Sequence, residues 1–348
     1  MLGALYLRDM DNLIVHNLIV HELKKQPEMA EAELVLSKAP LHITEQSIEL
    51  IGRLDQIFER KNDLLQGFLA EPDESLFPAY YETWLMEGRD RENFLTFSND
   101  TMTVLQQSLT GVIGAKGGYL LYADYTMEEQ RMLGIFLIRE TPGMIFVADE
   151  AEDALKLTTT QYLDVDHMAM AVRLLAGKGR NVQMIRHART QSSISQYFTE
   201  WVGLDRPETS AELTQNFLEL VEELPVPKDR DNGFAMNEGD FEKALVKYAA
   251  KQPQQTIRAK EFDEFFYGNE KPLQEMLEQG DGTLDEGFRV DKRSLRKQFY
   301  LKAGFGGMSL TCTKDHFRAG QISVDEQTGT ITINNQELAS LLLDQKGE

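Results

Sequence analysis

The stretch DKRSLRKQFYLKAGFGGMSL, residues 291–310, is the segment from which we interpret the rest of the chain. It begins with closely spaced basic residues, passes through a glycine cluster and continues into residues that alternate as strands do. Residues 288–320 contain eight Lys/Arg and two Asp, a local charge of +6, whereas the whole chain carries −21. A basic island kept in an acidic chain indicates an anionic partner as one explanation.

Two sets of basic side chains are candidates for contact with nucleic-acid phosphates. The C-terminal set is Lys292, Arg293, Arg296, Lys297, Lys302 and Arg318. The second set comes from a run with no acidic residue and is Arg173, Lys178, Arg180, Arg186 and Arg189. If both sets share a face, they predict weak, salt-sensitive binding that is independent of base sequence. The alternative hypothesis is a solvated face whose charges pair with acidic residues of the same molecule.

The glycine cluster consists of Gly304, Gly306 and Gly307, and the backbone N–H groups of such a cluster can cradle a phosphate. Its spacing matches neither the P-loop nor the dinucleotide-binding pattern, and a strand rather than a long helix is expected after it. We therefore favour a bulge or tight crossover that needs positive φ angles.

The best candidate for a metal site is the group Asp164, Asp166 and His167, because carboxylates and imidazole are common ligands. In an extended segment the two aspartates face one side and the histidine faces the other, which splits the set. We favour a strand-end turn stabilised by Asp side chains, and we predict no metal or other cofactor. The function that this group would support is a metal-dependent phosphoesterase or nuclease.

Nucleophilic catalysis has little support in the sequence. No G-x-S-x-G pattern occurs, and the single cysteine, Cys312, lies in an alternating run where a small buried side chain is expected. The sequence therefore predicts a protein that is not an enzyme.

The hydrophobic pattern predicts an α+β fold with largely antiparallel sheets and segregated helices. Alternating runs predict strands at 12–21, 33–37, 119–125, 131–139, 144–147 and 181–185, with 155–163 and 168–175 extending the same sheet. Helical spacing predicts helices over 44–62, 91–110 and 193–202. Pro72 and Pro78 predict a break across 71–80.

The charge pattern predicts three segments. Residues 1–204 form an N-terminal α+β domain, and residues 205–287, with twenty Asp/Glu and nine Lys/Arg, form an acidic helical segment. Its helices are expected near 211–223, 238–250, 259–266 and 273–278. Residues 288–348 form a basic, β-rich C-terminal segment with a hairpin at 321–333, and packing on the N-terminal sheet is one arrangement for it.

No apolar run approaches the ~20 residues needed to cross a bilayer, so we expect no membrane partner. The first residues lack the pattern of a signal peptide, and a single cysteine fits a reducing compartment. We therefore expect a cytoplasmic protein.

Three motifs of this chain resemble those of the bacterial nucleoid-associated protein family (NdpA-like), and they follow one another along the chain in the same order as in the family. They are residues 291–310 with the strand pair that follows, the segment TQYLDVDHM at 160–168 with the run to Arg173, and FLTFS at 94–98. The resemblance implies a protein of the nucleoid that binds DNA or RNA through local basic patches, or docks on a DNA-bound protein. The overall acidity leaves an acidic protein-interaction module as an alternative, and a homo-oligomer stays open.

Overall fold

The computed structural model describes residues 12–61, 64–149, 154–175, 181–185, 192–228, 235–279, 284 and 287–346. The chain divides into two compact units. Unit 1 is Met1–Ser210 with Asp285–Phe288, and unit 2 is Ala211–Leu284 with Arg289–Glu348. The acidic helices and the basic C-terminal segment therefore belong to the same unit.

Unit 1 is built on an antiparallel sheet with the strand order β10-β3-β9-β8-β5-β4-β1-β2. The strands are β1 (Leu13–Lys24), β2 (Glu33–Val35), β3 (Leu64–Leu69), β4 (Gly118–Met127), β5 (Gln130–Ile138), β8 (Met170–Leu175), β9 (Val182–Ile185) and β10 (Leu204–Thr209). The central strands β4, β5 and β8 are buried on both faces, which explains their nearly continuous apolar sequences.

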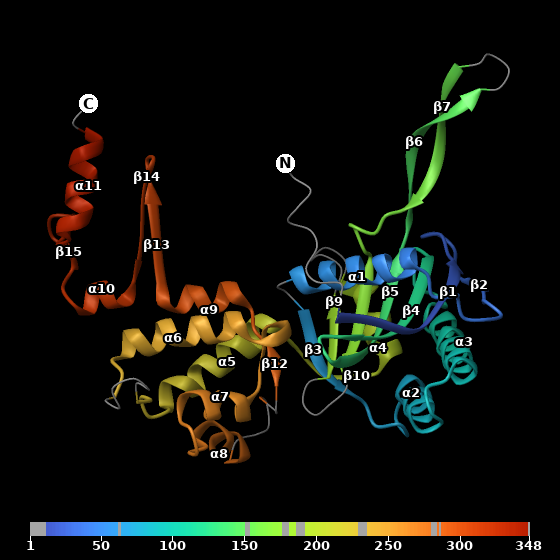
Figure 1. The fold of residues 1–348 in the computed structure, drawn as a ribbon, viewed down its shortest axis with the longest axis horizontal. Helices are drawn as coiled ribbons and strands as arrows, with labels where there is room; N and C mark the ends of the chain where they lie inside the picture. Colours follow the sequence, from blue (N-terminus) through green and yellow to red (C-terminus); the bar gives the residue numbers. More distant parts are fainter. Residues whose placement is uncertain are drawn as a thin grey trace. The chain divides into compact units, whose positions relative to one another are not determined.

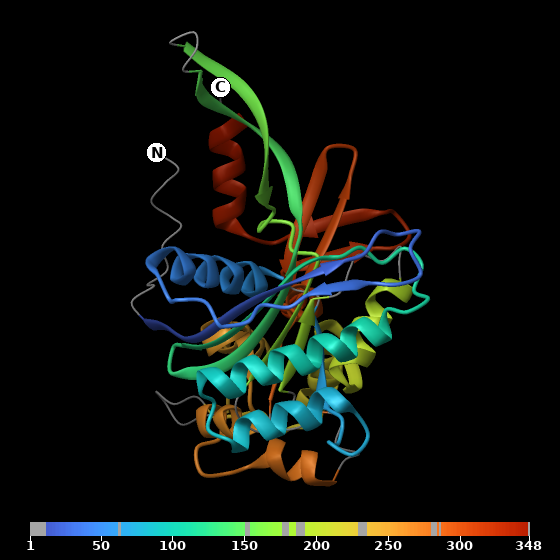
Figure 2. The same cartoon turned by 90° about the vertical axis from the view of Figure 1, so that its right-hand side faces the viewer.

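Helices cover both faces of this sheet, as the two views show (Figures 1 and 2). They are α1 (Glu45–Arg60), α2 (Leu76–Met86), α3 (Arg91–Ser108) and α4 (Ser192–Val202). One face carries α1 in a cluster with Leu54, Phe58 and Phe136. The other face carries α2, α3 and α4, whose aromatic side chains include the stacked pair Trp84 and Phe97. The predicted α+β fold with antiparallel strands and segregated helices is confirmed.

Helix α1 begins with a capping box at Thr44, the first residue of the helix predicted over 44–62. The Thr44 hydroxyl accepts from the Ser47 backbone N–H, and the Ser47 hydroxyl accepts from the Thr44 N–H at 2.7 Å. The predicted break across 71–80 is wrong at its C-terminal end, because α2 begins at Leu76. Pro78 lies in the first turn of that helix, where its missing N–H leaves no hydrogen bond unmade.

The strand pair β6 (Glu140–Asp149) and β7 (Ala154–Leu163) corrects a second prediction. Both segments form strands, but they pair only with each other, in a separate two-stranded ribbon. The ribbon extends away from the sheet of unit 1 (Figures 1 and 2). The sheet is instead continued by β8, which pairs with β5.

Unit 2 contains the predicted acidic helices around an aromatic core. The elements are α5 (Ser210–Glu223), α6 (Glu238–Lys251), β11 (Thr256–Ile257), α7 (Ala259–Phe266), α8 (Pro272–Gln279) and β12 (Phe288–Arg289). Phe262 is in edge contact with Phe217 and Tyr248, so three helices share one apolar centre. Asp263 of α7 is buried, and its carboxylate accepts from the backbone N–H groups of Leu273 and Gln274 at the start of α8.

The C-terminal segment continues unit 2 with short elements. They are α9 (Lys292–Phe299), β13 (Tyr300–Phe305), β14 (Met308–Thr313), α10 (Lys314–Arg318), β15 (Ile322–Asp325), β16 (Thr330–Ile333) and α11 (Gln336–Lys346). The strands form two separate hairpins, β13–β14 and β15–β16. None of the helices in the described ranges combines the length and the apolar character that a membrane span needs.

Candidate nucleic-acid interface

Helix α9 presents basic side chains on one side and apolar side chains on the other. Leu295 and Phe299, four residues apart, are buried, while Arg293, Arg296 and Lys297 are exposed. Positions i, i+3 and i+4 lie together on a helix surface, so these three cations form one cluster. No carboxylate within the described ranges lies at ion-pair distance from any of the three.

The start of α9 is fixed by Asp291. Its carboxylate accepts a hydrogen bond from the Ser294 N–H and so caps the helix. Its own N–H donates to the Thr214 hydroxyl on α5 at 2.8 Å, in a buried contact. The acidic residue inside the basic stretch therefore anchors the helix and does not neutralise its exposed face.

The hairpin β13–β14 follows α9 directly and places the glycine cluster at its tip (Figure 1). Phe305 pairs with Met308, so Gly306 and Gly307 alone make the turn, with φ of 58° and 85°. Two consecutive positive φ values are typical of a type I′ hairpin turn, which strongly favours glycine. Gly304 lies within β13, where an added Cβ would stand 3.1 Å from the Met308 carbonyl oxygen.

The two faces of this hairpin differ. Lys302 is exposed on the same face as Tyr300 and Thr311. Phe305 and Met308 share the other face at the tip and are 90% and 76% exposed. The hairpin therefore combines a cation near its base with an apolar, solvent-exposed tip.

Two other residues of the C-terminal set are less accessible to a nucleic-acid phosphate. Arg318 forms an ion pair with Glu242 of α6, at 3.2 Å between Nη1 and Oε1. Lys292 is half-buried. Charge matching within the molecule thus operates at Arg318, and the exposed cluster narrows to Arg293, Arg296, Lys297 and Lys302.

The prediction for Arg173 is wrong, because this side chain is fully buried in unit 1. Its Nη1 lies 3.0 Å from Asp55 and its Nη2 lies 2.6 Å from Glu59, both on α1. Burial disfavours the charged form, but the two carboxylates prevail and raise the pKa of Arg173 above its usual range. A guanidinium held in this way cannot reach a phosphate.

The rest of the second basic set lies outside the described residues. These are Lys178, Arg180, Arg186 and Arg189. Their role as phosphate contacts remains a prediction.

The group Asp164, Asp166 and His167 is divided between two kinds of contact. The Asp164 carboxylate accepts from the His167 backbone N–H and lies 2.9 Å from its Nδ1, which closes a turn after β7. Asp166 pairs with Arg53 of α1 at 2.7 Å, which lowers the pKa of its carboxyl group. Among the residues that the structure describes, no three His, Cys, Asp or Glu side chains gather as a metal site would require.

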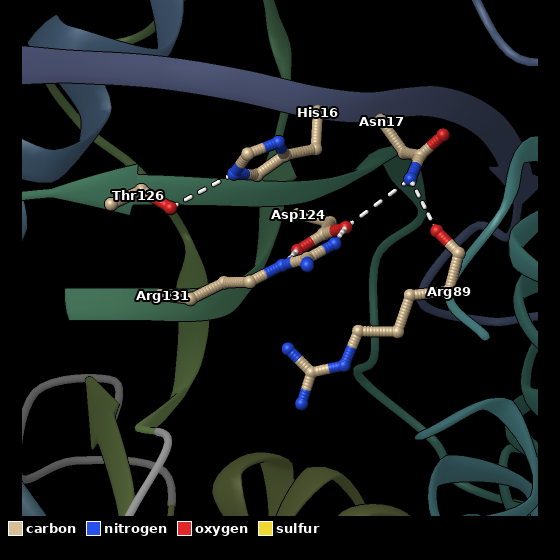
Figure 3. Close-up of polar contacts among 6 residues, drawn as sticks. All are labelled: His16, Asn17, Arg89, Asp124, Thr126 and Arg131. Atoms are coloured by element: carbon tan, nitrogen blue, oxygen red, sulfur yellow. Dashed lines mark hydrogen bonds and ion pairs between the residues drawn. The ribbon is translucent and has the colours of Figure 1, made fainter. Parts of the chain in front are cut away.

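A polar cluster at the end of β1, β4 and β5 was not predicted (Figure 3). Buried Asp124 accepts two hydrogen bonds from Arg131, at 2.8 and 2.6 Å, and a third from Asn17. Asn17 also donates to the Arg89 carbonyl oxygen, which ties the loop between α2 and α3 to the sheet. Burial, followed by the positive charge of Arg131, lowers the pKa of His16 nearby.

The contacts of this cluster hold β1, β4 and β5 to the loop between α2 and α3, which is a structural role. Arg89 adopts a positive φ of 53°, and its guanidinium lies over the ring of Trp84 at 5.5 Å from the centroid. The sequence signal for this cluster was a polar residue in each of two largely apolar strands, Asn17 in β1 and Asp124 in β4.

The fold and the exposed cations define a two-unit α+β protein with a small, locally basic surface on an acidic chain. The family model described as Nucleoid-associated protein YejK matches residues 19–340. The chain belongs to this nucleoid-associated protein family, as the resemblance of its three motifs predicts.

Curated relatives cover nearly the whole chain at low identity. A protein of Metapseudomonas resinovorans named Nucleoid-associated protein is 22% identical over 345 residues, 95% of this chain and 98% of the relative. Proteins of Escherichia coli (strain K12) and Shigella flexneri named Nucleoid-associated protein YejK are each 24% identical over 332 residues, 92% of this chain and 94% of the relative.

Proposed function

We propose that this is a non-enzymatic protein of the bacterial nucleoid that binds duplex DNA directly, weakly and without base-sequence preference. The contact surface is the exposed basic face of α9 together with Lys302 on the adjoining hairpin. The observation that carries the proposal is the exposure of Arg293, Arg296 and Lys297 on one helix face, without carboxylate partners in the described ranges. Membership of a nucleoid-associated family supports the choice of DNA as the polyanion.

The number of exposed cations sets the strength of binding. Four phosphate contacts give a slope of log K against log salt of about −3 to −4 for duplex DNA. Contacts to phosphates position a protein but do not distinguish bases, so the affinity is independent of sequence. The net charge of −21 repels DNA from the chain as a whole, which keeps the binding weak.

The apolar hairpin tip supplies a contact that does not depend on charge. Phe and Met side chains are among those that proteins insert between base steps from the minor groove. Phe305 and Met308 lie opposite each other at the end of a two-stranded ribbon and remain exposed. In the proposed complex they lie against or between bases while α9 and Lys302 contact the backbone.

The contacts of Asp164, Asp166 and His167 do not favour a metal-dependent phosphoesterase. Asp164 bonds to the backbone N–H and the ring of His167, whereas Asp166 pairs with Arg53, so the three side chains do not converge on one point. The exposed cations on α9 favour binding as the function of the described surface.

The test is fluorescence anisotropy on a labelled duplex, with the full chain and the variant Arg296→Glu/Lys297→Glu. Removal and reversal of two of four phosphate contacts is expected to weaken binding at least tenfold at low salt. The matched control is Lys260→Glu/Lys271→Glu, which makes the same charge change on α7 and directly before α8 and leaves α9 intact.

Three outcomes decide the proposal. Loss of affinity in the α9 variant with retention in the control supports it. Equal loss in both variants assigns binding to net charge alone and contradicts the proposed surface. Absence of binding by the unaltered chain contradicts direct contact with DNA and leaves docking on a DNA-bound protein.

A further inference from the structure

The ribbon β6–β7 carries an apolar face that packs against nothing else in the described structure. The register pairs Phe146 with Leu157 and Ala148 with Leu155, and paired residues point to the same side of a two-stranded ribbon. Met144 and Leu163 fall on this side by the same alternation. The apolar residues are therefore adjacent from Met144 to Leu155, and the pair Pro142 and Gln161 lies between them and Leu163.

The large side chains of this face are exposed to an unusual degree. Their exposed fractions are 72% for Met144, 72% for Phe146, 71% for Leu155, 56% for Leu157 and 41% for Leu163. We call these five residues the apolar face of the ribbon. A contiguous exposed patch of this kind marks an interaction site in a folded protein.

The ribbon is also almost free of charge. Residues 141–148 and 155–163 contain one charged residue, Lys156, in a chain that is 27% charged. Lys156 pairs with Val147 in the ladder and so lies on the opposite face. On the apolar side the charged residue is Glu140, which pairs with Leu163 at the start of β6 and accepts a hydrogen bond from the Tyr119 hydroxyl. From Met144 to Leu155 that side carries no charge, so a partner recognised through charge, such as DNA, an anionic membrane or a basic peptide, has nothing to recognise there.

We propose that the apolar face of the ribbon packs against the same face of a second copy of this chain and forms a two-fold symmetric dimer. In a two-fold interface each copy contributes the same surface, so that surface must be complementary to itself. An apolar, uncharged face meets this condition. A face with charges of one sign does not.

The surface area of the apolar face is consistent with a second copy of the chain as its partner. Side chains of this size at these exposures present on the order of 500 Å² of surface per copy. Two copies face to face then bury about 1,000 Å², which is at the lower limit for a specific interface. The same face against a small ligand would leave most of its length uncovered.

The net charge of the chain favours a dimer contact at the ribbon over a contact elsewhere on the surface. Two chains that each carry −21 repel each other over most of their surface. Close approach is least unfavourable where both surfaces are neutral and apolar, and the ribbon projects such a surface away from the sheet of unit 1 (Figure 2).

The test measures the mass of the full chain by light scattering after size-exclusion chromatography, over a range of concentrations. The unaltered chain is expected to be a dimer. Phe146→Asp/Leu157→Asp places two charges on the apolar face and is expected to give a monomer. The matched control is Ile145→Asp/Thr158→Asp, the neighbouring cross-strand pair on the opposite face, which is expected to remain a dimer.

The outcomes are distinct. A monomeric unaltered chain at every concentration overturns the proposal, as does a dimer that survives Phe146→Asp/Leu157→Asp. Dissociation of both variants overturns the choice of face, and a trimer or larger closed assembly overturns the two-fold symmetry. If the charged variant lacks a cooperative thermal transition, Phe146→Ala/Leu157→Ala replaces it, with at least a tenfold weaker dimer expected and unchanged dissociation counted against the proposal.

Discussion

Two arginine-containing regions of the chain each belong to a segment with a local excess of basic residues, but they differ completely in structure. Arg173 of β8 lies in the core of unit 1 between Asp55 and Glu59, whereas Arg293 and Arg296 of α9 lie on the surface of unit 2. A local positive charge in the sequence therefore does not identify a binding surface. The carboxylates that approach each guanidinium in space decide whether it stabilises the fold or remains available to a partner.

The largest effect is expected at the buried member of this comparison. Arg173→Ala leaves the Asp55 and Glu59 carboxylates without a counter-charge in the core and also removes the contact of the guanidinium with the Phe58 ring. Breaking a buried ion pair on one side lowers the free energy of unfolding by about 3–5 kcal/mol. Urea denaturation measures this loss.

The exposed counterpart serves as control. Arg293→Ala on the surface of α9 is expected to change the free energy of unfolding by less than ~0.5 kcal/mol. Equal effects of the two substitutions would contradict the distinction between a structural and an available arginine.

A second core prediction concerns pH and His21. Burial lowers the pKa of His21 to about 4 from 6.5, while its Nδ1 accepts from the Ser37 N–H at 3.2 Å. Between these two pH values the unfolded chain binds a proton that the folded chain does not bind. Stability is therefore expected to fall by about 2 kcal/mol as the pH decreases from 6.5 towards 4.

The variant His21→Gln checks this assignment. Its free energy of unfolding is expected to vary less with pH across the same window than that of the unaltered chain, in parallel denaturation series. An identical pH dependence in both proteins would assign the loss to other groups.

The next prediction concerns the exposed apolar residues at the tip of the β13–β14 hairpin, which carry no charge. Phe305→Ala/Met308→Ala removes apolar contact with bases but no charge, so the affinity for duplex DNA is expected to fall roughly tenfold, about 1.4 kcal/mol. The salt dependence of binding should stay the same, because no phosphate contact is lost. Anisotropy titrations at several salt concentrations separate these two effects. A changed slope with unchanged affinity at low salt would contradict the role of the tip.

The smallest effect is expected at Arg318. This side chain is exposed like the arginines of α9, but it forms an ion pair as buried Arg173 does. Its ion pair with Glu242 is half-exposed, and pairs of this kind contribute less than ~1 kcal/mol to stability. Glu242→Gln removes this ion pair and one negative charge from the molecule, so DNA affinity is expected to rise slightly. A large loss of stability in thermal melts would show that the pair is structural.

Much of the fold could be predicted from the sequence, because helical and alternating periods reflect local burial. The helices at 91–108 and 259–266 and the hairpin β15–β16 follow directly from such patterns. The separate ribbon β6–β7 could not be predicted in this way. Its alternation indicates two strands, but the choice of pairing partner depends on contacts that a linear pattern does not contain.

The candidate surface was predicted in part. Local charge identified Arg293, Arg296 and Lys297 as a set, and helix α9, which was not predicted in the β-rich segment, brings the three together within one element. The partners of Arg173 on α1 are more than a hundred positions away in sequence, and charge counting cannot find them. One signal was present: Arg173 interrupts an otherwise apolar run, MAMAVRLL at 168–175, as expected for a charge in a buried strand.

The most direct test of the account is the slope of log K against log salt for duplex DNA, measured for the unaltered chain and for Arg296→Glu/Lys297→Glu. A surface of four cations predicts a slope of about −3 to −4 for the unaltered chain and a slope shallower by about 2 for the variant. The same slope in both proteins would contradict the claim that the exposed face of α9 contacts the DNA backbone.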